Sequence, residues 1–106
     1  MSYETNPYYN PEVHGLTIVG SVDCDGGYGF DMFVVWTDGK ALYWGQDSGC
    51  SCPSPFEDAN TLGDLCSGSR KECLRAIDAW AFDEYHSNLH EVPSLKAAVE
   101  SWRSTR

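Results

Sequence analysis

The dipeptide Asp38-Gly39 separates two runs of strand-forming residues, and no other feature constrains the fold of this chain as strongly. Residues 30–37 read FDMFVVWT and residues 41–46 read ALYWGQ, so apolar and aromatic side chains dominate both runs. An Asp-Gly pair readily adopts the backbone angles of a tight turn, and between two such runs it predicts a β-hairpin. We therefore expect an antiparallel sheet.

A third strand is expected over residues 16–22, where LTIVGSV alternates apolar and small polar side chains. The run 30–37 is apolar on both faces: one face carries Phe30, Met32, Val34 and Trp36, and the other carries Phe33 and Val35. A strand of this kind is typical of the centre of a sheet. The pattern predicts a three-stranded antiparallel meander over residues 16–46.

Two helices are expected after the strands. Ser69 and Glu72 form an S-x-x-E capping box, which predicts a helix over residues 70–86. A second helix begins at Pro93-Ser94, and its apolar positions recur at helical spacing: Leu95, Ala98, Val99 and Trp102. Each helix has one apolar face, so both are expected to cover one side of the sheet. The predicted fold class is α+β.

The length of 106 residues suits a single domain. We divide it into an N-terminal arm (1–15), antiparallel strands (16–46), a Cys/Pro loop (47–69) and two helices (70–103). If the helices cover only one face of the sheet, Phe33, Val35 and Tyr43 are left open on the other. The Tyr-rich arm is one expected cover for that face, and a second copy of the chain, forming a homodimer, is the alternative.

Acidic residues are concentrated in the first two-thirds of the chain. The net charge is −9, and residues 1–69 hold ten acidic residues against a single Lys. This balance argues against direct binding of nucleic acid, which requires Lys and Arg to displace counterions. The acidic part is either a solvated surface that keeps the protein soluble, a face that docks a basic protein surface, or an imitation of DNA phosphates.

The termini and the cysteines predict a cytoplasmic protein. The first residues lack the basic and apolar regions of a signal peptide, and no apolar run approaches the roughly 20 residues that span a bilayer. Five cysteines are an odd number, which fits reduced thiols better than a disulfide framework. A disulfide, either between Cys50 and Cys52 or over a longer range, remains an alternative.

Cys50-Ser51-Cys52 provides the candidate metal ligands, but a second ligand pair is missing. Cys66 and Cys73 are separated by six residues, and His86 and His90 form an H-x3-H pair that nothing in the sequence brings to the loop. We therefore expect no metal and no cofactor. A thiol nucleophile would need His14, His86 or His90 beside one of these cysteines, and nothing in the sequence orients such a pair. We expect no catalytic residues.

The stretch 47–57, DSGCSCPSPFE, is the least ordinary part of the chain. Pro53 and Pro55 fix the backbone φ angle and stiffen it. It is either a rigid crossover from sheet to helix or a preorganised loop that inserts into a partner. The predicted partner-binding residues are Asp47, Cys50, Cys52, Pro53, Pro55, Phe56 and, on the preceding strand, Tyr43.

The hairpin followed by DSGCSCPSPFED resembles small uncharacterised proteins encoded by phages of actinobacteria. The resemblance covers roughly residues 28–65 and is carried mainly by Tyr43-Trp44 and the stretch 47–58. It implies a phage origin and the cytoplasm of the infected host as the compartment, and it implies no particular reaction.

The function that we expect is that of a non-enzymatic module. It would bind a host or phage protein through its acidic strand-side surface and the Cys/Pro loop. Two alternatives stay open: a DNA mimic that inhibits a nucleic-acid-binding protein, and a Cys/His metal-binding or thiol-dependent enzyme.

Overall fold

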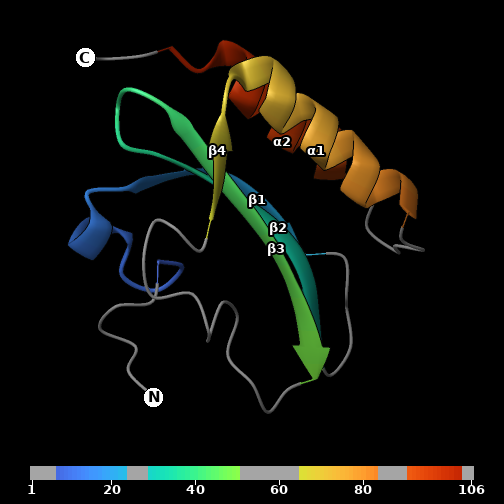
Figure 1. Ribbon diagram of the computed structural model, residues 1–106. Coiled ribbons are helices and arrows are strands. Elements are labelled where there is room, and N and C mark those ends of the chain that lie inside the picture. Colours follow the sequence, from blue (N-terminus) through green and yellow to red (C-terminus); the bar gives the residue numbers. More distant parts are fainter. Residues whose placement is uncertain (1–6, 24–28, 51–64, 84–90, 104–106) are drawn as a thin grey trace.

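A four-stranded antiparallel sheet and two helices make up the part of the chain that the computed structural model describes, residues 7–23, 29–50, 65–83 and 91–103 (Figure 1). The elements in chain order are a 3-10 helix η1 (Pro11–His14), β1 (Thr17–Asp23), β2 (Gly29–Thr37), β3 (Leu42–Cys50), β4 (Cys66–Gly68), α1 (Arg70–Asp83) and α2 (Val92–Ser101). The strands lie in sequence order, β1-β2-β3-β4. The predicted α+β class and the meander of the first three strands are confirmed.

The Asp38-Gly39 turn joins β2 to β3. Thr37 pairs with Leu42, so the turn contains four residues, and β3 begins one residue later than predicted. Gly39 has a φ angle of 94°, which favours glycine. The Oδ1 atom of Asp38 accepts hydrogen bonds from the backbone N–H groups of Lys40 at 2.8 Å and Ala41 at 3.0 Å. The backbone N–H groups of the turn therefore find their hydrogen-bond acceptor within the turn itself. This is why the dipeptide Asp38-Gly39 was enough to predict it.

The boundaries of the predicted 47–69 loop were wrong at both ends. β3 continues to Cys50, because β2 starts at Gly29 and extends opposite the whole of β3. At the other end, the short strand β4 pairs with Leu42–Trp44 of β3. The residues at both ends of the predicted loop are mostly small or polar and have a low preference for strands. They form strands nevertheless, because residues 47–50 pair with β2 and residues 66–68 pair with β3. Residues 51–64 of this segment lie outside the described residues.

The capping box at the start of α1 forms as predicted. The hydroxyl Oγ of Ser69 accepts a hydrogen bond from the backbone N–H of Glu72 at 3.2 Å. In return, the Glu72 carboxylate accepts one from the backbone N–H of Ser69 at 3.1 Å. α2 begins at Val92, just before the predicted start, and the predicted end of the first helix at residue 86 lies outside the described residues.

Both helices cover the same face of the sheet, as Figure 1 shows. α1 contacts β3 and β4, whereas α2 contacts β1. The core between helices and sheet comprises Val22, Phe33, Val35, Leu42, Trp44, Cys73, Ile77, Trp80, Val92, Leu95 and Val99. An ion pair between Lys96 and Asp78, 2.9 Å long, joins the two helices on their exposed side. The Arg70 guanidinium joins them at one end, since it donates a hydrogen bond to the Trp102 carbonyl and lies over the Trp102 ring.

The opposite face of the sheet carries a second buried cluster. It comprises Leu16, Met32, Val34, Trp36 and Leu65, with Tyr8, Ile18 and Tyr43 packed against it. The segment 7–16 reaches this face, and the indole Nε1–H of Trp36 donates a hydrogen bond to the carbonyl of Pro7 at 2.9 Å. The expectation that the arm lies on the sheet is therefore confirmed for this segment.

The side chains that lie on each face of the sheet are not those that were predicted. Phe33 and Val35 point toward the helices and are 2% and 0% exposed. Tyr43 lies on the opposite face, because it pairs with Trp36, while its neighbour Trp44 pairs with Val35. The predicted set of Phe33, Val35 and Tyr43 on one open face was wrong. A strand that is apolar on both sides does not reveal which side the helices cover.

Candidate protein-binding groove

The residues predicted to bind a partner are only partly described. Tyr43 and Asp47 are both half-buried residues of β3, four positions apart, so they share the face of the sheet opposite the helices. Cys50 is the last residue of β3. Cys52, Pro53, Pro55 and Phe56 lie outside the described residues.

Tyr43 belongs to the turn structure as well as to this face. Its hydroxyl donates a hydrogen bond to Oδ2 of Asp38 at 3.2 Å. Hydrogen bonds from the backbone of Ala41 and Lys40 hold the pKa of Asp38 below its usual range. Burial and the nearby Asp38 carboxylate raise the pKa of Tyr43. Both pKa values move away from neutrality, so neither group is suited to transfer protons at neutral pH.

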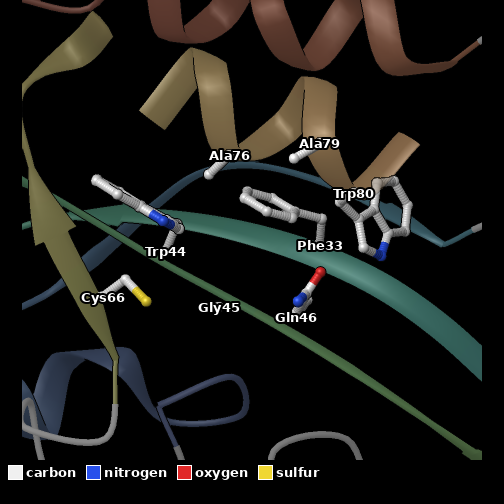
Figure 2. Close-up of a pocket in the computed structure, with 8 residues that line it drawn as sticks. All are labelled: Phe33, Trp44, Gly45, Gln46, Cys66, Ala76, Ala79 and Trp80. Atoms are coloured by element: carbon white, nitrogen blue, oxygen red, sulfur yellow. The ribbon is translucent and has the colours of Figure 1, made fainter. Parts of the chain in front are cut away.

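A groove that the sequence did not predict lies on the helix side, between β3 and α1 (Figure 2). Its volume is about 280 Å³. The residues that line it are Phe33, Trp44, Gly45, Gln46, Cys66, Ala76, Ala79 and Trp80. None of these is Asp, Glu, Lys, Arg or His, so the groove is an uncharged concavity in an acidic chain.

The groove is lined by small residues on both β3 and α1, namely Gly45, Ala76 and Ala79. Ala76 and Ala79 are three positions apart on α1, and their short side chains lie on the α1 side of the groove, across from Trp44 and Phe33 (Figure 2). Gly45 has no side chain to fill the space below them. The Phe33 and Trp80 rings pack against each other with their centroids 5.7 Å apart and form an aromatic wall. The sequence shows two small residues on one side of the helix, but it does not show which part of the sheet lies opposite them.

β4 lies beside only the first part of β3. It pairs with Leu42, Tyr43 and Trp44, whereas β3 continues to Cys50. Gly45 and the exposed Gln46 border the groove beyond this pairing.

Trp44 adds a third aromatic ring to the lining of the groove. The residue is buried, with 8% of its surface exposed. An aromatic concavity with a few polar groups is the usual form of a binding site.

Cys66 and Cys73 are free thiols in different environments. Cys66 is exposed beside the groove, whereas Cys73 is fully buried in the helix-side core. Burial raises the pKa of Cys73 to about 12, so it stays protonated and is a poor nucleophile. Across residues 7–23, 29–50, 65–83 and 91–103, no three His, Cys, Asp or Glu side chains gather where they could hold a metal ion. Cys52 lies outside these ranges.

Comparison with known proteins gives a family and no described activity. Neither the curated proteins nor the solved structures contain a match to this chain. Within the described residues, neither helix has the length and apolar character that would cross a membrane. The model of one family, described as "Domain of unknown function (DUF7574)", matches residues 5–104. Because this match spans nearly the whole sequence, the chain belongs to the DUF7574 family.

Proposed function

We propose that this chain is a non-enzymatic module that binds a protein partner in the groove between β3 and α1. The observation that carries the proposal is the aromatic groove itself, which is lined by the buried rings of Phe33, Trp44 and Trp80. Tyr, Trp and Phe are enriched where proteins meet, because they bury a large area with little loss of conformational freedom.

The charge of the chain supports a partner with a basic surface. The net charge is −9. A field of this sign speeds the encounter with a basic protein and repels other acidic ones. Its effect on binding declines as salt screens it. We therefore expect association to weaken as ionic strength rises.

The resemblance to phage proteins of actinobacteria supports a partner from the host or the phage itself, met in the host cytoplasm. Tyr43 and Asp47 are candidates for a further contact on the opposite face of the sheet, and Cys50, Cys52, Pro53, Pro55 and Phe56 stay predicted binding residues from the sequence. A DNA mimic is favoured less, because Asp38, one of the acidic residues it would display, already uses both carboxylate oxygens within the turn.

Affinity capture with matched variants tests this function. The tagged chain, Ala79→Arg and Ala97→Arg are incubated with a lysate of an actinobacterial host at low and at high salt. Ala79 lines the groove, whereas Ala97 is an exposed residue of α2 outside it. Both variants add the same charge to an exposed helix position.

We expect a specific partner that the original chain and Ala97→Arg retain and that Ala79→Arg loses. The partner is then purified and its binding measured by calorimetry. If Ala79→Arg retains the partner as well as Ala97→Arg does, or if none of the three captures a partner, the proposed function is wrong.

A further inference from the structure

We infer that a second groove, between β1 and α2, receives a long basic side chain of a protein partner, that of Lys or Arg. This inference goes beyond the proposed function and does not depend on the groove between β3 and α1. That groove has no carboxylate in its lining, although the chain carries a net charge of −9. The groove between β1 and α2 has one, which belongs to Glu91.

The groove between β1 and α2 lies at the other edge of the layer that the helices form with the sheet. α1 contacts β3 and β4, whereas α2 contacts β1, and β1 is the first strand in the order of the described sheet. The volume of this groove is about 290 Å³. Pockets for small molecules start at about 300 Å³, so a space of this size suits one inserted side chain.

Small residues bring α2 close to β1 at this groove. The pairing of β1 with β2 shifts its register between Ile18 and Gly20. A Cβ atom at Gly20 would lie 2.9 Å from Leu95 Cδ1 and 3.8 Å from Ala98 Cβ, so the backbone of β1 is in close contact with the helix. Val19, Leu95 and Ala98 provide the aliphatic side chains of the lining.

The lining residues of α2 change from charged to apolar along one side of the helix. They are Glu91, Ser94, Leu95 and Ala98, and their spacings of three or four residues place them in one row. At a rise of 1.5 Å per residue, this row extends over about 10 Å. A Lys or Arg side chain has a matching order of groups, because its aliphatic stem packs on apolar surface while its charged end stays at a polar rim.

The Glu91 carboxylate is available to a ligand. Glu91 stands at the N-cap position of α2, is exposed, and makes no capping hydrogen bond with its side chain. Within the described ranges it also forms no ion pair, since Lys96 of the same helix pairs with Asp78 at 2.9 Å. The start of a helix carries about half a positive charge, which the full negative charge of the carboxylate outweighs.

Charge complementarity identifies the occupant of this groove. Among the described residues that line it, Glu91 is the only ionisable one, and no Lys, Arg or His repels a cation there. A second copy of the chain would bring a net charge of −9 toward this carboxylate, so a basic protein surface fits better. The Ser94 hydroxyl can accept a further hydrogen bond from the bound cation.

Capped tripeptides of the form acetyl-Ala-X-Ala-amide test this inference. X is Lys, Arg, ε-acetyl-lysine, which keeps the stem without the charge, or diaminopropionic acid, which keeps the charge on a short stem. Each peptide is titrated into the isotope-labelled full chain at low salt and followed by NMR. We expect saturable shifts of the Gly20, Ser94 and Leu95 amides with the Lys and Arg peptides, and the tighter of the two identifies the side chain. The other two peptides should bind at least roughly threefold more weakly.

Two matched variants separate this groove from the general attraction of an acidic chain. Glu91→Gln and Glu100→Gln each remove one negative charge from an exposed position, at opposite ends of α2. Glu91→Gln should weaken binding of the tighter peptide by roughly three- to fivefold, whereas Glu100→Gln should change it by less than about 1.5-fold. Ala98→Leu should abolish the saturable shifts because it fills the groove. Thermal unfolding checks that each variant remains folded.

The inference is wrong if no peptide gives saturable shifts at Gly20, Ser94 and Leu95, or if Glu91→Gln and Glu100→Gln weaken binding equally. Equal binding of the Lys and ε-acetyl-lysine peptides would also overturn it, because the carboxylate would then contribute nothing. The capture experiment with Ala79→Arg concerns the groove between β3 and α1, so the failure of either proposal leaves the other standing.

Discussion

Trp36→Phe tests whether the segment 7–16 is an integral part of the fold. The Trp36 side chain is fully buried, and its indole N–H reaches the carbonyl of Pro7, 29 residues away in the chain. Pro7 is itself fully buried. Phenylalanine fills most of the same space but has no donor, so the Pro7 carbonyl loses its partner in a place that water does not reach.

The expected loss of stability has two parts. A buried carbonyl left without its hydrogen bond costs about 1–3 kcal/mol. Replacing a buried indole by the smaller phenyl ring costs about 1 kcal/mol in packing. Together they predict that the free energy of unfolding falls by about 2–4 kcal/mol, which corresponds to a melting temperature roughly 10–20 °C lower for a domain of this size.

Urea unfolding followed by circular dichroism measures this loss, and Trp102→Phe is the control. Trp102 is a half-buried residue after α2, and a phenyl ring there can keep the contact with Arg70. Limited chymotrypsin digestion gives a local readout, since a loosened segment should be cut sooner after Tyr8 or Tyr9. If Trp36→Phe costs no more than Trp102→Phe, and cleavage is unchanged, the segment is not held as the structure indicates.

Three further predictions concern single positions. Gly20→Val should lower the free energy of unfolding by about 1–3 kcal/mol, because even a Cβ at this position would lie 2.9 Å from Leu95 Cδ1. A thermal shift assay measures this loss, and an unchanged melting temperature would show that α2 can move away. Iodoacetamide should modify Cys66 in the native protein, while Cys73 reacts only after unfolding; peptide mapping by mass spectrometry that finds early modification of Cys73 would contradict its burial. Ser69→Ala should destabilise the protein by about 1 kcal/mol at pH 7 in urea unfolding. Hydrogen bonds from Ser69 hold the pKa of Glu72 below its usual value. The stability that the Glu72 carboxylate adds is therefore fully present above the pKa of Glu72 in the unfolded chain, and it is lost as the pH falls through the lower pKa of Glu72 in the folded chain. An NMR titration should find the pKa of Glu72 closer to its ordinary value in Ser69→Ala, and an identical titration in both proteins would refute the capping argument.

The features that the sequence alone determined are those whose hydrogen bonds lie within a few residues. The turn at Asp38 satisfies its own backbone within the next three residues. The start of α1 is determined by the exchange between Ser69 and Glu72. Both arrangements depend on side chains that are close in the chain, so the printed sequence contains all the partners. The apolar faces of the two helices could also be predicted, because helical spacing alone places the apolar residues of each helix on one side.

Only the tertiary structure decided which face of the sheet each strand residue occupies and where the groove lies. β2 is apolar on both sides, and the choice between them depends on the helices and on the segment that carries Pro7, far away in the chain. β4 is recognisable only through its pairing with Leu42–Trp44, because its three residues have no strand pattern of their own. The groove combines Gly45 with Ala76 and Ala79, thirty or more residues apart. A gap between packed elements is a property of their spacing in three dimensions, and no local pattern of side chains records it.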